Sequence, residues 1–344
     1  MAFSIHSVTS RSVRGADKKV EPNLDHDADT DTDAANEVSD LILRELQNLQ
    51  DVPSMDMGRF EWMVANDDFE VIPGDFNNDG LMDIAVFNKN QGSMWKTIPI
   101  AFATTDGRWE ITNANVGNFF TKKWVASGNM QIIPGDFNGD GFLDIALVNH
   151  KVTSGWETIP VAFGRGNGTF QILDINVGEN FASKWTTTEH VEIIPGDFNG
   201  DGITDIALVG GSDFNSIPVI YGSKNKTWDL RQRLVYHDFT KDWARKSSVK
   251  VISGDFDGDG MTDIALINQS YGWKTIPVAY GTPTGFDVKG QSEPGPIVNL
   301  FANDGVKAIT GDFNRDGKDD IALVNDSTFI SYIYTNGREW KTGW

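Results

Sequence analysis

The chain has 344 residues, of which 39% are hydrophobic and 23% charged, and 49 acidic against 29 basic side chains give it a net charge of −20. It contains no cysteine, which excludes disulfide-stapled modules, cysteine-ligated metal centres and a catalytic thiol. Because a chain this acidic is repelled by phosphate groups, nucleic acid is not an expected partner. No apolar run approaches the ~18–20 residues that a membrane-spanning helix needs.

Residues 1–57 are predicted to form an acidic, largely disordered leader. The first 19 residues lack the apolar segment of a classical signal peptide. In the stretch EPNLDHDADTDTDAANE, aspartates alternate with small residues, and such a composition buries too little apolar surface to offset its chain entropy. Loose chelation of a cation by these aspartates is the less favoured interpretation. A short helix is expected near 36–50, where Asn36 can cap a stretch with apolar residues at helical spacing.

Five copies of one loop occupy residues 58–344, beginning about 60 residues apart. The copies read PGDFNNDGLMDIAVF, PGDFNGDGFLDIALV, PGDFNGDGITDIALV, SGDFDGDGMTDIALI and TGDFNRDGKDDIALV. A second module, such as SGWETIPVAF, follows the first four loops with variation, and linkers such as NVGENFASKW join successive units. Three modules repeated in one order indicate a repeat architecture.

Each loop follows the pattern D-x-[DN]-x-D-G-x-x-D, with side-chain oxygens at positions 1, 3, 5 and 9. Such closely spaced oxygens suit Ca²⁺, which takes roughly six to eight of them, and the glycine at position 6 permits the sharp turn. Without a cation, the converging carboxylates would repel one another. We therefore expect about five Ca²⁺ ions, one per repeat, with the position-7 carbonyl as a fifth ligand. The expected ligands are Asp75, Asn77, Asp79, Leu81, Asp83, Asp136, Asn138, Asp140, Phe142, Asp144, Asp197, Asn199, Asp201, Ile203, Asp205, Asp255, Asp257, Asp259, Met261, Asp263, Asp312, Asn314, Asp316, Lys318 and Asp320.

The loop begins like that of an EF-hand, which requires a glutamate at position 12 and a helix on each side. Position 12 is Val86 in the first copy and leucine in the others. The flanking segments, such as EVIPGD and DIALV, are short apolar runs typical of strands. An EF-hand is therefore rejected.

Each unit is predicted to contain four short strands, which in the second copy are QIIPGD, DIALVN, TIPVAF and TFQILD. The expected fold is all-β: a β-propeller of about five four-stranded blades, with a calcium loop in each blade and a disordered or helical N-terminal segment before it. A linear solenoid is less favoured, because it needs polar capping repeats that the first and fifth copies do not provide.

The loop segments resemble FG-GAP/VCBS-type repeats, the calcium-loop blades also found in integrin α-subunit propellers. The order of loop, G-x-G-T-F hairpin (164–170) and N-F-x-x-x-W linker (180–185) resembles that of fungal propeller lectins of the Psathyrella velutina type, which have seven blades. The resemblance covers roughly residues 58–344. It implies a calcium-stabilised propeller that binds carbohydrate.

Most of the 11 tryptophans recur at two positions of the repeat. A tryptophan offers a flat apolar face and one N–H donor, which suits stacking under a sugar ring. A repeated tryptophan also suits packing between blades, and both interpretations stay open. The candidate sugar-binding residues are Trp124, Trp185, Trp243 and Trp62 in or before the linkers, and Trp95, Trp156 and Trp273 before the third strand.

The leading hypothesis is a calcium-stabilised, multivalent lectin with sugar sites between blades, where repeated weak sites gain avidity. Its expected partners are glycans or glycoproteins, and a homo-oligomer is left open. The alternative is a protein-interaction or adhesion propeller, and a targeting module related to carbohydrate-active enzymes is less favoured. No enzyme is expected, because the five histidines occupy unrelated repeat positions and no nucleophile elbow or phosphate-binding glycine loop occurs.

The sequence features that bear on localisation favour different compartments. Calcium loops and four glycosylation sequons fit an extracellular protein, whereas the lack of a signal peptide and of cysteine favours a cytoplasmic or non-classically secreted one. The sequons begin at Asn167, Asn225, Asn268 and Asn325.

Overall fold

The computed structural model describes the chain from residue 55 onward, apart from short gaps. The described residues are 55–90, 95–117, 119–153, 155–211, 214–235, 238–269, 273, 275–290, 306–324, 330–335 and 337–343. They all belong to one unit, Val52–Trp344. The predicted disordered leader and its helix near 36–50 lie outside the described residues.

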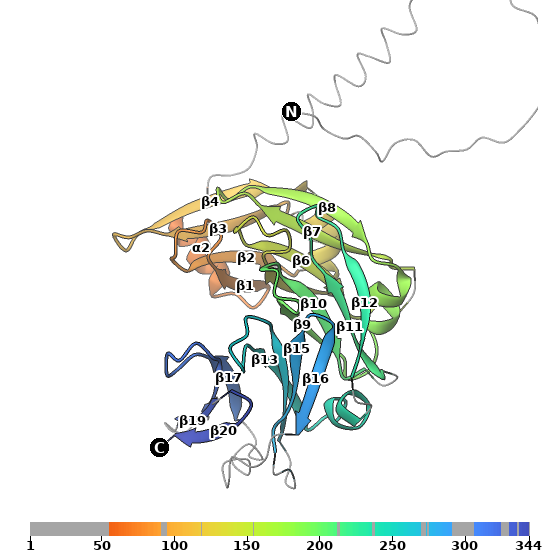
Figure 1. Ribbon diagram of the computed structural model, residues 1–344. Helices are drawn as coiled ribbons and strands as arrows, with labels where there is room; N and C mark the ends of the chain where they lie inside the picture. Colours follow the sequence, from red (N-terminus) through yellow and green to blue (C-terminus); the bar gives the residue numbers. More distant parts are fainter. Residues whose placement is uncertain are drawn as a thin grey trace, which may run out of the picture. The chain divides into compact units, whose positions relative to one another are not determined.

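Each repeat forms one four-stranded antiparallel sheet in which the strands pair in chain order, so the repeats are the blades of a five-bladed β-propeller (Figure 1). This confirms the predicted fold class. Blade 1 contains β1 (Phe69–Gly74), β2 (Asp83–Asn88), β3 (Thr97–Ala103) and β4 (Trp109–Asn115). Blade 2 contains β5 (Met130–Gly135), β6 (Asp144–Asn149), β7 (Thr158–Gly164) and β8 (Phe170–Asn176).

The other three blades repeat this plan. Blade 3 contains β9 (Glu192–Gly196), β10 (Asp205–Val209), β11 (Ser216–Tyr221) and β12 (Asp229–Leu234). Blade 4 contains β13 (Val249–Gly254), β14 (Asp263–Asn268), β15 (Pro277–Thr282) and β16 (Gly285–Gly290). Blade 5 contains β17 (Lys307–Gly311), β18 (Asp320–Val324), β19 (Ile330–Thr335) and β20 (Trp340–Gly343).

The predicted calcium loop is the turn between the first and second strands of each blade. In blade 2 it is bounded by the register pair Gly135 and Asp144, so loop position 9 is the first residue of β6. Every residue of β6 is buried, as expected for the apolar strand at the centre of a blade that is covered on both faces. The loop is therefore anchored on the most buried strand of its sheet.

The hydrophobic clusters extend from one blade to the next. The cluster that holds Phe76 of blade 1 also holds Ile145 of blade 2, and the cluster with Phe137 of blade 2 also holds Ile206 of blade 3. The phenylalanine after the first loop aspartate is at most 2% exposed in the first four blades, at Phe76, Phe137, Phe198 and Phe256. Each blade is thus stabilised chiefly by burial against its neighbours.

A repeated pair of contacts also joins blades through the loops at three junctions, those of blades 2 and 3, 3 and 4, and 4 and 5. Thr204, at loop position 8 of blade 3, packs on Gly135 of blade 2 so closely that a Cβ on this glycine would lie 2.6 Å from the threonine methyl. The main-chain N–H of Thr204 donates a 2.7 Å hydrogen bond to the carbonyl oxygen of Asp136. The same bond runs from Thr262 to Asp197 at 2.6 Å and from Asp319 to Asp255 at 2.7 Å.

The three linkers that the structure describes, for which no strand is predicted, form short helices. They are η1 (Phe119–Trp124) with η2 (Val125–Ser127), η3 (Asn180–Trp185) and η4 (Asp238–Ala244). Each of η1, η3 and η4 buries one phenylalanine completely, at Phe120, Phe181 and Phe239. A helix, α2 (Met57–Val64), also precedes blade 1 and buries Phe60 and Met63. None of the helices in the described part of the chain has the length and hydropathy needed to cross a bilayer.

Candidate functional site

The loop predicted to bind calcium is folded around its own first aspartate. In blade 2, Asp136 Oδ1 accepts main-chain N–H bonds from Gly139 at 2.7 Å and Asp140 at 3.2 Å, and Oδ2 accepts one from Gly141 at 2.8 Å. Gly141 has φ +85°, the left-handed conformation that was expected of the position-6 glycine. Asp140 Oδ1 in turn accepts the N–H of Phe142 at 3.0 Å.

The position-9 aspartates are buried at the start of the second strand in every blade. They are Asp83, Asp144, Asp205, Asp263 and Asp320, each with 0% exposure. Asp144 Oδ2 accepts the N–H of Phe137 at 3.0 Å, and its Oδ1 accepts the N–H of Gly164 at 2.8 Å. This carboxylate therefore ties the loop to the end of the third strand.

Burial strongly raises the pKa of the position-9 carboxyls. The pKa of Asp144, Asp205 and Asp263 rises to about 8, chiefly by desolvation, although main-chain hydrogen bonds lower it. Carboxylates at other positions of the same loop raise it further, as Asp140 does for Asp144. A bound cation would favour the ionised form instead.

The fourth loop provides the best fit to a hard cation. Oxygen atoms of Asp255, Asp257 and Asp263, at positions 1, 3 and 9, all lie within 4.8 Å of one another. Asp257 Oδ1 is buried without a hydrogen-bond partner among the described residues, and its Oδ2 accepts a 3.0 Å bond from Arg338 Nε of blade 5. Oxygens of this kind and spacing fit Ca²⁺; the predicted ligand sets of all five loops stay predictions.

The position-7 residues, predicted to offer their carbonyls, send their side chains toward the neighbouring blade. A Cβ on Gly139 of blade 2 would lie 2.9 Å from Ile203 of blade 3, and one on Gly200 would lie 3.2 Å from Met261. These side chains thus help to hold successive loops together.

The linker and hairpin tryptophans meet in aromatic pairs. The rings of Trp243 and Trp273 lie 6.1 Å apart, and Trp185 lies 6.4 Å from Phe214, which stands at the hairpin position of blade 3. Trp124 is 9% exposed, in a cluster against which Trp156 packs. These contacts fit the packing interpretation, and sugar binding by the tryptophans stays a prediction.

Blade 1 differs because its tryptophan before the first strand is open to solvent. Trp62 on α2 is 58% exposed. The centroid of its ring lies 5.7 Å from that of Phe69, and the Phe69 centroid lies 5.9 Å from that of Trp95. Of the seven predicted tryptophans, Trp62 is the one with a face broadly available to a ligand.

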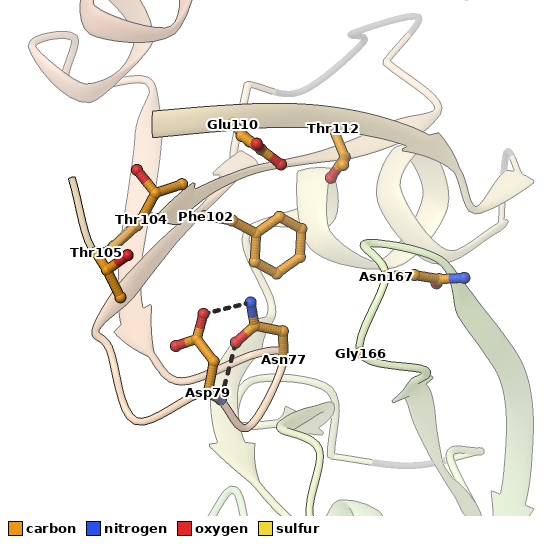
Figure 2. Close-up of a pocket in the computed structure, with 10 residues that line it drawn as sticks. Asn77, Asp79, Phe102, Thr104, Thr105, Glu110, Thr112, Gly166 and Asn167 are labelled. Carbon is orange, nitrogen blue, oxygen red and sulfur yellow. Dashed lines mark hydrogen bonds between the residues drawn. The ribbon is translucent and has the colours of Figure 1, made fainter. Parts of the chain in front are cut away.

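A pocket of about 420 Å³ lies between the β3–β4 hairpin and loop of blade 1 and the β7–β8 hairpin of blade 2 (Figure 2). We call it the blade 1–2 pocket. The ring of Phe102 faces into it, surrounded by polar groups (Figure 2). Its other lining residues are Asn77, Asp79, Ala103, Thr104, Thr105, Glu110, Thr112, Gly166 and Asn167.

Two features make this pocket a candidate ligand site. It combines an apolar ring with converging hydroxyl, amide and carboxylate groups, the usual chemistry of small-molecule sites. The hydroxyl of Thr112 is buried and has no hydrogen-bond partner among the described residues. No repeated sequence pattern predicts the pocket, because most of its lining comes from hairpin residues that vary between copies. The signal that could have found it is the aromatic residue near the end of each third strand, such as Phe102 and Phe163.

Comparison with known proteins identifies a repeat family and solved structures of similar fold. The FG-GAP-like repeat family matches residues 75–147, 136–208 and 197–266. None of the curated protein sequences matches the chain. Among solved structures, a lectin of Agrocybe aegerita, described as specifically recognising non-reducing terminal N-acetylglucosamine, superposes with a TM-score of 0.60 at 16% identity. The alignment covers 80% of this chain and 66% of the lectin, so the chain spans just under two thirds of that protein's length.

A second solved structure, the exotype rhamnogalacturonan lyase YesX, is 15% identical over 73% of this chain and 50% of its own. Its TM-score of 0.31 is too low to bear on function. At these identities, the likeness to the Agrocybe lectin concerns the fold.

Proposed function

Because the chain belongs to the FG-GAP-like repeat family and folds as a five-bladed propeller, we propose that it is a carbohydrate-binding protein stabilised by calcium. The observation that carries this proposal is the blade 1–2 pocket, with the face of Phe102 beside the unpaired hydroxyl of Thr112. A sugar supplies what both groups lack, a C–H face for the ring and a hydroxyl partner for the threonine. The likeness to a lectin in fold supports the same proposal.

Binding without catalysis is the function we propose. Of the two carboxylates in the pocket, Asp79 accepts a 2.8 Å bond from the N–H of Leu81 and a 2.9 Å bond from Asn77 Nδ2. It therefore serves the loop fold and is poorly placed to act as a general acid or base, which must reach the proton it transfers.

Multivalent binding through the repeated tryptophans has weaker support. Trp62 is well exposed, but the others lie in aromatic pairs or clusters between blades. In this proposal the blade 1–2 pocket is the primary site, and the tryptophan positions are secondary ones.

A panel of immobilised glycans, probed in calcium and after its removal, tests the proposal. We expect saccharide binding in calcium, and we expect Thr112→Val to weaken it at least tenfold, since the variant keeps the shape and removes the hydroxyl. The matched control is Thr188→Val, whose hydroxyl bonds to Lys184 in η3 outside the pocket. Failure of the folded protein to bind any saccharide would favour a protein-interaction propeller instead.

A further inference from the structure

The blade 1–2 pocket has counterparts at other blade junctions, where a basic side chain fills it. This basic residue lies in the hairpin between the third and fourth strands of a blade, two positions before the aromatic residue at or next to the start of the fourth strand. In the β11–β12 hairpin this residue is Lys226, and in the β19–β20 hairpin it is Arg338; in the β7–β8 hairpin, beside the open pocket, the same position holds Gly168.

At the junction of blades 2 and 3, Lys226 lies over the aromatic ring of the preceding blade. Its Nζ is 4.6 Å from the centroid of Phe163, the counterpart of Phe102. The same Nζ donates a 2.8 Å hydrogen bond to Gln171 Oε1. The ammonium group thus meets both a ring face and an oxygen acceptor.

At the junction of blades 4 and 5, Arg338 occupies the same position. Its Cζ is 4.5 Å from the centroid of Tyr280, and its Nη1 donates a 2.6 Å bond to Asp287. Asp287 and Gln171 occupy equivalent positions, because each directly follows the aromatic residue of its own fourth-strand arm, Phe286 or Phe170. Two junctions therefore hold a cation over a ring, beside the same polar position.

The blade 1–2 pocket has the same receptor without the cation. Phe102 supplies the ring, Glu110 stands at the position of Gln171 and Asp287, and Asp79 adds a second carboxylate. Gly168 has φ +77°, in the same left-handed region as the +58° of Lys226, but it packs directly on Thr112, whose Oγ1 would lie 2.1 Å from a Cβ at this position. None of the residues that line the pocket is basic.

We propose that the blade 1–2 pocket binds the ammonium group of an amino sugar, that is, a saccharide unit with a free, protonated amine. This rests on the proposed carbohydrate-binding function and names its ligand class. The ring of Phe102 attracts the cation, Glu110 offsets its charge, and Thr112 and Asn167 are left for the sugar hydroxyls. A basic peptide would also supply a cation, but it carries fewer hydroxyl groups than a sugar for Thr112 and Asn167 to bind.

Calorimetry with β-linked glucosamine oligomers and their fully N-acetylated counterparts tests the ligand class. We expect the free-amine oligomer to bind at least tenfold more tightly, with about one site per chain, and Glu110→Gln to remove most of that preference. Equal or tighter binding of the N-acetylated oligomer would overturn the amino-sugar proposal and leave carbohydrate binding standing. Binding of a lysine-rich peptide but of neither oligomer would overturn both.

Filling the pocket from within is the sharper test. Gly168→Lys copies the lysine of the next junction and should abolish oligomer binding; because a Cβ at this position would lie 2.1 Å from Thr112 Oγ1, Gly168→Ala is the control for that contact and should keep more of the binding than Gly168→Lys. Gly155→Lys is the matched control, since it is a glycine of the same blade with φ +74° and open space around its Cβ. Undiminished binding by a folded Gly168→Lys protein would overturn the proposal. Conversely, Lys226→Gly with Gln171→Glu should add a second site.

An independent observation concerns the two ends of the blade series. Among the described residues, all six exposed large hydrophobic side chains lie there: Trp62, Val64, Met82 and Trp109 before or in blade 1, and Ile309 and Phe313 in blade 5. Phe313 is 40% exposed, whereas its counterparts in the other blades are buried. Met82 stands at loop position 8, whose counterpart Thr204 packs on Gly135, and it is 62% exposed.

Between successive blades, the glycine before the loop of one blade contacts the position-8 side chain of the next. Blade 5 carries the glycine of this contact, Gly311, and blade 1 carries the position-8 side chain, Met82. The nearest atoms to a Cβ on Gly311 of blade 5 belong to Phe313 of the same blade, not to a following blade. Because both halves are exposed in one chain, its own blades do not complete this contact. We infer that blade 5 binds blade 1 of a second copy, in a head-to-tail contact equivalent to those within the chain.

Since the chain has no cysteine, disulfide trapping tests this contact cleanly. In three existing junctions a Cβ on the glycine would lie 2.8–2.9 Å from the Cβ of the position-8 residue, which is shorter than the roughly 3.5–4.5 Å that a disulfide spans, so the two blades must separate by about 1 Å for the bond to form. Oxidising a mixture of Met82→Cys and Gly311→Cys proteins should give a dimer of one chain each. Trp109→Cys, exposed on β4 of blade 1, replaces Met82→Cys as the control and should not cross-link.

Two outcomes would overturn the head-to-tail contact. One is the absence of a cross-link between the single variants above background. The other is a double variant, Met82→Cys with Gly311→Cys, that closes only within its own chain, because the blade series then completes its own ring. Light scattering of the unmodified protein should agree, with a mass that rises with concentration and falls again with Phe313→Asp.

Discussion

The position-9 aspartates are costly residues for a protein without a bound cation. Each is fully buried, and in three blades the pKa reaches about 8 against an ordinary value of 3.8. These carboxyl groups are shielded from water and lie near other carboxyl groups of the same loop, and both conditions disfavour the ionised form. A bound cation would stabilise the ionised form.

These carboxyls predict an unusual pH dependence for metal-free protein. Between pH 4 and pH 8 the folded state retains protons that the unfolded state releases, so the free energy of unfolding falls as pH rises through this window. Protein freed of metal by dialysis should therefore melt at a higher temperature at pH 5.5 than at pH 8. Scanning calorimetry checks this, and a melting temperature that drops on acidification over this range would contradict it.

At the scale of single residues, the repeated acids could be predicted and the pocket could not. Asp83, Asp144 and their counterparts recur in one pattern, which itself marks them as functional. Glu110 and Thr112 lie on a fourth strand whose residues differ from copy to copy. Their role depends on the hairpin of the next blade, which completes the pocket. Strand pairing within one repeat does not predict this contact between two repeats.

Among the elements, the strands were predictable because each is short, apolar and bounded by turn residues. The four strands predicted for the second repeat coincide closely with β5 to β8. The linker helices were missed, although Phe181 and Trp185 in NFASKW stand four residues apart and share one side of a helix. The six-residue span is too short for a periodic signal, and its helix is stabilised by burial of Phe181.

The contact between successive blades predicts a sharp contrast between two equivalent glycines. A Cβ on Gly135 would lie 2.6 Å from the methyl of Thr204 and 2.9 Å from its Cβ, whereas the nearest atom to one on Gly311 is 3.6 Å away. Gly135→Ala should therefore destabilise the protein by about 1–3 kcal/mol through overpacking. Gly311→Ala should change the free energy of unfolding by less than about 0.5 kcal/mol.

Urea denaturation of dilute protein, where copies do not associate, measures both changes. Equal effects of the two substitutions would show that the glycine matters for its own backbone and not for the neighbouring blade. The pair thus separates a contact between elements from a property of one element.

For the whole molecule, the loops lie where the blades meet. Each loop joins the first and second strands of its blade, and in blades 2, 3 and 4 its first aspartate accepts through its carbonyl the N–H of the next blade, as Asp136 does from Thr204. Its ninth residue also holds the third strand, as Asp144 does through Gly164. A cation in the loop would therefore stabilise both a blade and its junction, and its loss would affect the series as a whole.

Calcium should accordingly raise the melting temperature in a concentration-dependent way. A ligand that binds only the folded state adds about 2.7 kcal/mol per site at one hundred times its Kd, and the predicted sites number about five. Calcium also offsets part of the net charge of −20, so sodium chloride at equal ionic strength must be run to measure simple screening. Magnesium is the second control, because its small octahedral shell suits a loop of this kind poorly. A melting temperature equal in calcium, magnesium and chelator would contradict metal binding by the loops, and native mass spectrometry would count the ions if it rises with calcium alone.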